Sequence, residues 1–246
     1  TNIEFANILR TDGNETKKLF LQQKIEFPKI FNDGTLIKPS AYLNAGVYNI
    51  EKFQNPKTNT FEFNKIRTNF FPQLSLEISK PFYKKDKNYI TIISPKILGI
   101  KSNKKSFFRE IPDESSIDNF DFDYIDLFNV NRLSGNDRFD SSTRIDYGLT
   151  FLKKKVAKNE DITLIEVGQS FQIDKNKYLQ QNSGINDRFS DIVINFRLTP
   201  QENIKLNSYL KINKDNSSIK TAYSDFLIHQ RNSFLSVSNI RSAPVL

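Results

Sequence analysis

The chain of 246 residues has no cysteine, no methionine and no tryptophan, and it has a single histidine, His229. Without cysteine it can form no disulfide within itself and no thiolate metal site. A single imidazole leaves too few ligands for a zinc site and too few partners for a catalytic triad. His229 lies in a segment of alternating polarity, so we interpret it as a polar position on a sheet.

Long apolar runs are missing as well. No run approaches the roughly 18 residues that a membrane helix needs, which excludes a helical membrane protein. Strands of a membrane β-barrel are only about 10 residues long and half polar, so that class stays open. The chain begins at Thr1 with neither an initiator methionine nor a signal segment, and we expect it to be part of a longer protein.

Sequence motifs of enzymes are absent too. There is no glycine-rich phosphate loop and no nucleophile elbow, so we predict neither an enzyme nor a cofactor. The acidic group Asp118, Asp121, Asp123 and Asp126 has the composition of a calcium site. It lacks a glycine where a tight calcium loop needs one, and we therefore predict no metal site.

The composition of the chain shows an excess of basic residues and many phenylalanines. The net charge is +8, and 22 residues are phenylalanine. A basic chain suits anionic lipid, a polyanionic ligand or nucleic acid. The lysine clusters, such as the one at 153–155, lack the interleaved aromatic residues of a platform for single-stranded nucleic acid. We therefore expect no nucleic acid partner.

Alternation of apolar and polar residues is the dominant pattern. The clearest case is DIVINFRLT at 191–199, followed after a short turn at Pro200 by NIKLNSYLKIN at 203–213. In each run the apolar residues share one face: Ile192, Ile194, Phe196 and Leu198, then Ile204, Leu206, Leu210 and Ile212. Two alternating runs joined by a tight turn predict a β-hairpin.

Further segments alternate in the same way: LIKPSAYLNAGV at 36–47, QLSLEIS at 73–79, FDFDYID at 120–126 and TRIDYGLTF at 143–151. About ten such segments have the length of membrane strands, and their charges gather on one face. We predict an all-β fold, an antiparallel up-and-down transmembrane β-barrel of which residues 1–246 form an incomplete arc within one domain. A β-sandwich also alternates, but its usual strand has only ~5–6 residues.

The stretch LFNVNRLSGNDRFDSSTRIDYG at 127–148 concentrates glycine, Asp-Arg and Ser-Thr in one place. Gly135 lies between two strand-like segments, so Ser134–Asp137 is predicted to be a turn. A second stretch, SGINDR at 183–188, uses the same residue types before a strand. We expect the Asp and Arg residues to pair inside a lumen or to hold a loop on the wall, which is a structural role.

In this order the motifs resemble the LptD family, also called OstA or Imp, of outer-membrane lipopolysaccharide-assembly proteins. The resemblance covers most of residues 30–213. Its segments are FFPQLSLEISKPF at 70–82, ISPKILG at 93–99, LFNVNRLSGNDR at 127–138, STRIDYGL at 142–149, VGQSFQI at 167–173 and SGINDRFSDIV at 183–193. The positions that match the family motifs are Asn131, Arg132, Ser134, Gly135, Asp137, Arg138, Gly148, Gln169, Ser170, Asp187, Arg188 and Asp191.

The resemblance implies a segment of a large barrel that delivers lipopolysaccharide to the outer leaflet of the cell outer membrane without catalysis. It also implies four partners: lipopolysaccharide, outer-membrane lipid, an LptE-like plug lipoprotein and an LptA-like periplasmic bridge. The chain departs from the family pattern because it has no recognisable jellyroll domain, stops at Leu246 before the final strands, and lacks the cysteines that tie the domains together in some members. Two alternatives stay open, a general outer-membrane pore and a secreted β-sandwich that binds a polyanion.

Overall fold

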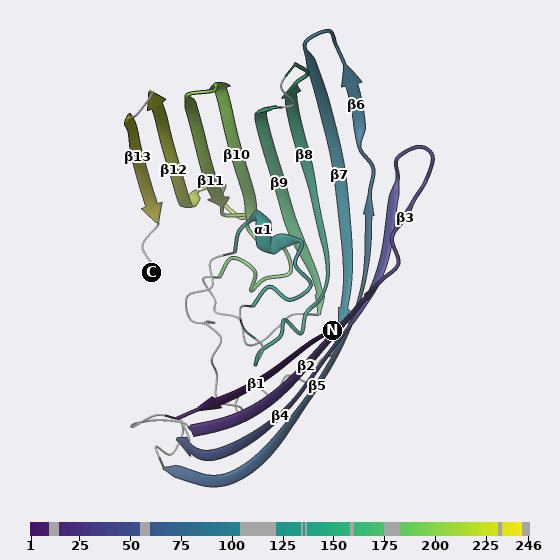
Figure 1. The fold of residues 1–246 in the computed structure, drawn as a ribbon, viewed down its shortest axis with the longest axis vertical. Helices are drawn as coiled ribbons and strands as arrows, with labels where there is room; N and C mark the ends of the chain where they lie inside the picture. Colours follow the sequence, from purple (N-terminus) through teal and green to yellow (C-terminus); the bar gives the residue numbers. More distant parts are fainter. Residues whose placement is uncertain are drawn as a thin grey trace.

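One antiparallel β-sheet of 13 strands makes up the fold (Figure 1). The computed structural model describes residues 1–9, 15–54, 60–103, 122–133, 135, 137–157, 160–174, 183–230 and 233–242. Within these residues the one helix, α1 (Tyr124–Leu127), has four residues. No described helix is long and apolar enough to cross a membrane.

The strands lie side by side in chain order, as an up-and-down sheet requires. Their bounds are β1 (Asn2–Ile8), β2 (Glu15–Glu26), β3 (Lys29–Ile30), β4 (Leu36–Gln54), β5 (Phe61–Ser79), β6 (Phe82–Lys85), β7 (Tyr89–Ser102), β8 (Thr143–Lys155), β9 (Glu160–Asp174), β10 (Ile192–Gln201), β11 (Ile204–Ile212), β12 (Ile219–Gln230) and β13 (Ser233–Ser242). The short strands β3 and β6 continue β2 and β5 beyond interruptions at Pro28 and Pro81, and they pair with β4 and β7. Proline explains each interruption because it has no N–H to donate to a neighbouring strand.

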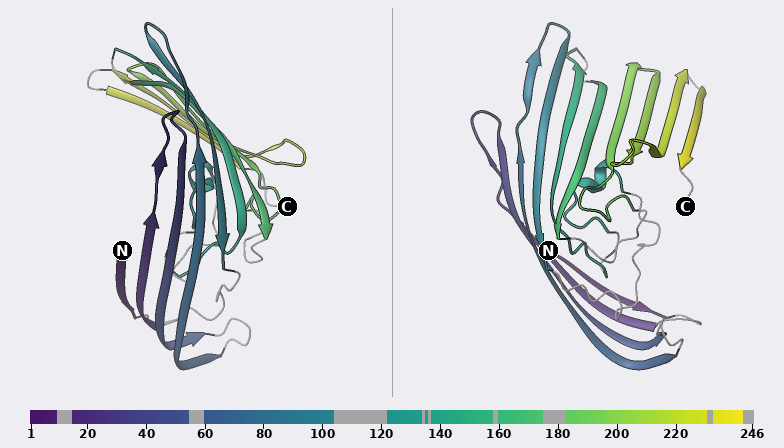
Figure 2. Two further views of the ribbon diagram at one scale, coloured as in Figure 1. Left: turned by 90° about the vertical axis from the view of Figure 1, so that its right-hand side faces the viewer. Right: turned by 180° about the vertical axis from the view of Figure 1, so that it is seen from behind.

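The sheet is curved and open. No pairing joins β1 to β13 among the described residues, and β1, β2, β4 and β5 sweep away from the remaining strands at one end (Figures 1 and 2). This is the predicted incomplete barrel arc. The second stacked sheet of a β-sandwich is missing from the described part of the chain, so the sandwich alternative has no support.

The two faces of the sheet differ in polarity. In the predicted hairpin, Ile194 pairs with Leu210 and Leu198 with Leu206, which places their side chains on one face, here called the outer face. The outer face continues across β5 and β7 through the pair Ile78 and Ile97. The opposite, inner face carries polar residues, among them Gln73, Arg144, Asp146, Asn195 and Arg197.

Two connections fold against the inner face: residues 122–142 after β7 and residues 183–191 after β9. We call them the first and second inner segments. Figure 1 shows α1 and the described parts of these connections on the concave side of the sheet. Their apolar side chains form the main core with Val193 of β10. This core contains Phe122, Tyr124, Leu127, Leu133, Ile185 and Val193. The outer-face residues of β10 are opposite this core, and they are not in a compact interior.

The strand predicted at 120–126 was wrong for its described part. Residues 124–127 form α1, because the Asp123 side chain accepts a hydrogen bond of 2.8 Å from the backbone N–H of Asp126 and so caps a helical turn. Tyr124 and Leu127, three residues apart, are both buried on the same side of that turn. Phe120 and Asp121 lie outside the described residues.

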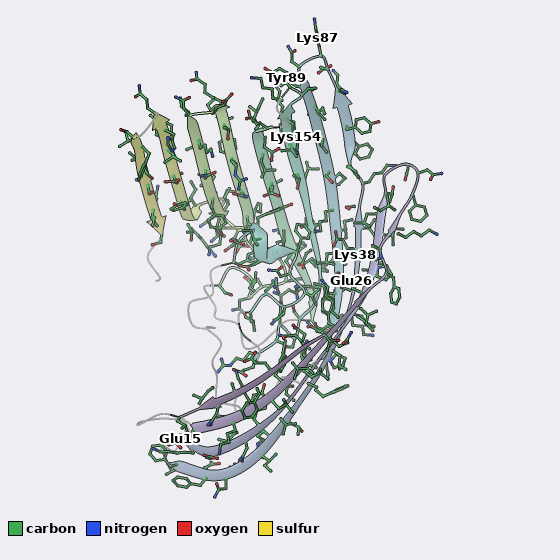
Figure 3. The ribbon with its side chains drawn as sticks, viewed as in Figure 1. Glu15, Glu26, Lys38, Lys87, Tyr89 and Lys154 are labelled. Carbon is green, nitrogen blue, oxygen red and sulfur yellow. The ribbon has the colours of Figure 1, made fainter. Side chains whose placement is uncertain are left out.

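The two ends of the sheet carry connections of different length. At one end, the short-turn end, the connections are residues 31–35, 86–88, 156–159, 202–203 and 231–232. At the other, the long-loop end, they are residues 9–14, 55–60, 103–142, 175–191 and 213–218. Figure 3 shows Lys87, Tyr89 and Lys154 toward the short-turn end and Glu15 at the long-loop end.

Candidate functional site

A network of buried charges joins the first inner segment to β8. The Nε atom of Arg132 lies 2.6 Å from Oδ2 of Asp140, and NH1 of Arg144 lies 2.9 Å from the same oxygen. Arg144 also reaches Asp146 on its own strand, with Nε 2.9 Å from Oδ2. The side chains of all four residues are at most 1% exposed, so two guanidinium groups and two carboxylates compensate each other away from water.

Serine hydroxyls and backbone carbonyls complete the network. Ser142 Oγ donates to Asp140 over 2.6 Å, and Ser170 Oγ donates to Asp146 over 2.5 Å. Arg144 also donates to the carbonyl oxygen of Asn129. Burial alone would raise the pKa of Asp140, but the guanidinium groups of Arg132 and Arg144 outweigh it and hold that pKa far below its usual range. Asp140 therefore remains a carboxylate.

Asn131 shapes the chain next to Arg132. Its Oδ1 atom accepts a hydrogen bond of 2.9 Å from the backbone N–H of Asp140, and its Nδ2 donates to the carbonyl of Arg138. These bonds close residues 131–140 into a compact loop. Gly135 has φ of 83°, which glycine adopts without strain, and it is exposed at the tip. Ser134 lies outside the described residues.

The same loop reaches the opposite part of the sheet. Asp137 lies 3.2 Å from Nζ of Lys18 on β2, and the side chains of both residues are less than a tenth exposed. Next to this ion pair, Phe139 stacks between Phe20 and Phe71, with ring centroids 6.1 Å and 5.1 Å away. The first inner segment thus connects β2 and β5 with β8 across the arc.

The second inner segment is held by backbone hydrogen bonds between residues 188–190 and β9, by side-chain amides and by Asp191. Gln169 Nε2 donates to the carbonyl of Ser190 over 2.9 Å. Asp191 is 2% exposed and lies 2.7 Å from Nζ of Lys220. Asp187 and Arg188 are exposed, and Asp187 lies 3.3 Å from Lys214. Of these motif positions, Asp191 and Gln169 fasten the segment to the wall, while Arg188 is exposed.

Two glycines let the first inner segment approach the sheet closely. Gly148 and Gly168 are cross-strand partners on the inner face of β8 and β9. A Cβ atom on Gly168 would lie 2.3 Å from the Leu127 side chain and 2.9 Å from the Tyr147 carbonyl. A Cβ atom on Gly148 would lie 3.0 Å from the Phe128 ring and 2.8 Å from the Val167 carbonyl. The helical turn α1 packs on this flat, side-chain-free patch.

The inner face also forms an open basin at the short-turn end, with a volume of about 1230 Å³. Its charged lining residues are Lys153, Lys154, Lys155, Arg197 and Lys205, with Glu160, Asp161 and Glu202. By strand register Lys153, Lys155 and Glu160 fall on outer-face positions. Lys154, Arg197 and Lys205, against Asp161 and Glu202, leave the inner side of the basin with a net positive charge. Asn195 and Asn207 add neutral hydrogen-bonding groups. This chemistry suits a phosphorylated, hydroxyl-rich molecule better than an apolar one.

The ion pairs and the polar basin of the inner face are typical of a scaffold or of a passage for a polar molecule. The buried carboxylates are compensated by arginines, and no group of three or more metal-ligating side chains occurs among the described residues. The sequence patterns indicated Arg132 and Ser170 but missed Asp140, Ser142 and Lys18, which complete the network. Position in the alternating run TRIDYGLTF does place Arg144 and Asp146 on the polar face, but alternation cannot show which loop covers them.

Comparison with known proteins supports a specific assignment. A search of curated proteins found no match. The family described as LptD, LPS transport system D, matches residues 1–244, which is nearly the whole chain. The antiparallel, strand-rich arc with one apolar face agrees with that match. The chain therefore belongs to the LptD family of outer-membrane proteins, whose role is lipopolysaccharide transport and assembly of the outer membrane.

Proposed function

We propose that residues 1–246 form part of a single barrel domain, and that this arc is one wall of the translocon that moves lipopolysaccharide into the outer leaflet. The observation that carries the proposal is the contrast between the faces. The outer face is apolar, as contact with lipid requires, and the inner face holds a net positive polar basin. A phosphorylated saccharide would move past the basin, and no covalent step is needed.

The motif positions have a structural role in this proposal. Arg132, Asp137 and Asp191 hold the two inner segments against the wall through their ion pairs. The segments narrow the space inside the arc, so the lipopolysaccharide path would run beside them. An LptE-like plug lipoprotein and an LptA-like bridge are the partners that the family resemblance adds. With the short turns in the periplasm, the basin would lie on the side from which such a bridge delivers lipopolysaccharide.

Photocrosslinking in growing cells tests the proposed path. A photoreactive phenylalanine analogue replaces Arg197, which lines the basin, in the full-length protein. The matched control carries it at Leu198, the next residue, on the outer face. We expect lipopolysaccharide adducts at position 197 that disappear when the cells are depleted of ATP, and fewer adducts at 198. Equal labelling at both positions, or none at 197, would contradict the path.

Conductance separates the translocon from a general pore. The purified full-length protein, with any lipoprotein that co-purifies, is placed in a planar bilayer. A plugged translocon should show no steady ion current, whereas an open pore conducts without a partner. A steady current from the intact complex would favour the pore.

A further inference from the structure

An apolar groove crosses the outer face between β4 and β9, on the side of the sheet opposite the inner segments. Its volume is about 600 Å³. Residues that line it include Phe27, Leu74, Leu76, Gly99, Ile145 and Ile173. Register places three of them in adjacent strands, since Gly99 of β7 pairs with Leu76 of β5 and with Ile145 of β8. The groove therefore follows consecutive strands of the wall.

Small residues form the floor of this groove. Gly99 has no side chain, and a Cβ atom there would meet only the Leu76 carbonyl oxygen, at 4.0 Å. Ala41 of β4 lies opposite Leu74 and contributes a single methyl group. The walls stand out from this floor, because Leu74 is 59% exposed and Ile173 is 53% exposed. An elongated apolar group can lie along Gly99 without displacing any side chain.

A lysine lies at one end of the groove. Lys101 lines the groove, is exposed, and pairs across the strands with Leu74. It forms no ion pair with any residue that the structure describes. Lys17, a second outer-face lysine, is different because its Nζ lies 2.6 Å from Glu51. Among the described residues, therefore, Lys101 offers an ammonium group with no ion-pair partner beside the apolar groove.

The position of Lys101 along β7 indicates which leaflet of the membrane it would contact. It is the second-last residue of β7, directly before the connection 103–142, so it lies at the long-loop end. Membrane barrels have their short turns in the periplasm and their long loops outside the cell, which puts Lys101 at the level of the outer leaflet. A lysine near a membrane surface attracts anionic headgroups, and the acyl chains of the same lipid would extend from there along the groove.

We propose that this groove is a binding site for one lipopolysaccharide molecule of the outer leaflet, with an acyl chain over Gly99 and a phosphate at Lys101. The site is separate from the passage on the inner face. It requires that the wall contact lipid, but it does not require that lipopolysaccharide move past the basin.

Native mass spectrometry of the purified full-length protein tests the site. The protein in mild detergent is mixed with purified lipopolysaccharide or with phosphatidylethanolamine, and the lipid-bound fraction is measured. Gly99→Trp fills the groove, and its control Ala222→Trp adds the same bulk to the outer face of β12. Lys101→Ala removes the cation, and its control Lys87→Ala removes an exposed lysine at the short-turn end.

We expect Lys101→Ala to lower lipopolysaccharide retention about fivefold, and Gly99→Trp to lower it at least as much. The two controls should retain it like the unchanged protein. Phosphatidylethanolamine, which has no net negative charge, should bind weakly to all variants. Unchanged retention in Lys101→Ala, or equal retention of both lipids, overturns the proposal. Lys101→Ala removes only an exposed side chain, so it decides the question even if Gly99→Trp does not fold.

Failure of this site and failure of the proposed transport role give different results. If the variants remove the groove site but the passage works, lipopolysaccharide adducts at position 197 stay unchanged while lipopolysaccharide retention by the purified protein falls. If the groove binds lipopolysaccharide but the proposed passage is wrong, no adducts form at position 197 and lipopolysaccharide retention by the purified protein is unchanged.

Discussion

Arg144 is the residue on which most of the buried network depends. It contacts Asp140, Asp146 and the backbone of the first inner segment, and its side chain is fully buried. Removing one partner of a buried ion pair leaves an uncompensated charge, which typically costs about 3–5 kcal/mol. The cost should appear first where the inner segment meets the wall.

We therefore expect Arg144→Ala to release the first inner segment. Hydrogen exchange of residues 122–133 in the full-length protein should become faster by orders of magnitude, while β10 and β11 stay protected. Arg197→Ala, which removes an exposed arginine of β10, is the control and should change little. Similar exchange in both variants would show that the network does not hold the segment.

Asp126 makes the same segment sensitive to pH. Burial, and then the nearby charge of Asp123, raise the pKa of Asp126 to about 6. The folded segment therefore holds this proton more tightly than the unfolded chain does. Between the usual aspartate pKa and about 6, stability must fall as pH rises. Asp140 does not oppose this trend, because its pKa lies far below this range.

The expected effect of pH is modest. The shift corresponds to about 3 kcal/mol at full burial, and the partial exposure of Asp126 reduces it to about 1 kcal/mol. The free energy of local opening of residues 124–133, measured by hydrogen exchange, should be higher at pH 5 than at pH 8. Asp126→Asn should abolish most of that difference. A pH dependence that persists in Asp126→Asn would assign it to another group.

At the scale of elements, the glycine pair sets how closely α1 approaches the sheet. Gly168→Ala puts a methyl group against the Leu127 side chain and a backbone carbonyl, and such overpacking typically costs about 1–3 kcal/mol. Gly99→Ala on the outer face meets no close atom and should cost much less. Thermal unfolding of the two variants in detergent measures the difference. Equal melting temperatures would mean that α1 shifts without cost.

The hairpin β10–β11 tests which face contacts lipid. Phe196→Arg places a charge on the outer face and should destabilise the inserted protein by roughly 2–4 kcal/mol near the midplane. Asn195→Arg should be nearly silent, because Asn195 is on the polar inner face and bonds to Glu166 over 2.8 Å. The amount of folded full-length protein in the outer membrane reports both. Equal losses would argue against a membrane wall.

The sequence predicts elements of this kind well where the information is local. The hairpin at 192–212 follows from alternation, and the register Ile194–Leu210 agrees with it. The turn itself lies at residues 202–203, because Pro200 is still part of β10. The region at 120–126 also alternates, yet its described part is a helical turn, because the cap at Asp123 and the core around Leu127 favour a helix. Alternation could not reveal this, since the deciding contacts come from β9 and β10.

The inner network shows the limit of sequence reasoning. Arg132 and Ser170 are 38 positions apart and Lys18 and Asp137 are 119 apart, so no spacing rule connects them. Motif similarity did indicate Arg132, Asp137 and Ser170. The partners Asp140 and Lys18 become evident only when the curved sheet brings β2 and β8 to opposite sides of one loop.

At the scale of the whole molecule, the orientation of the sheet can be tested directly. The long-loop end should lie outside the cell and the short-turn end in the periplasm. Asp215→Cys at the long-loop end should react with a membrane-impermeant maleimide on intact cells, whereas Lys87→Cys should react only after the outer membrane is permeabilised. Because this part of the chain has no cysteine, each label reports a single position within it. The reverse pattern would invert the topology and move Lys101 to the inner leaflet.

The strands differ greatly in length around the arc. The edge of the sheet at the long-loop end therefore extends further at the long strands than at the short ones. β4 and β5 have 19 residues each, whereas β10 has 10 and β11 has 9. At about 3.3 Å per residue, the long pair extends about 30 Å further than the short pair. The extra length belongs to the curved part of the sheet at the long-loop end (Figure 1). In the proposed orientation, a sugar chain that leaves at the long-loop end would be flanked by the long strands on one side of the arc and by the short strands on the other.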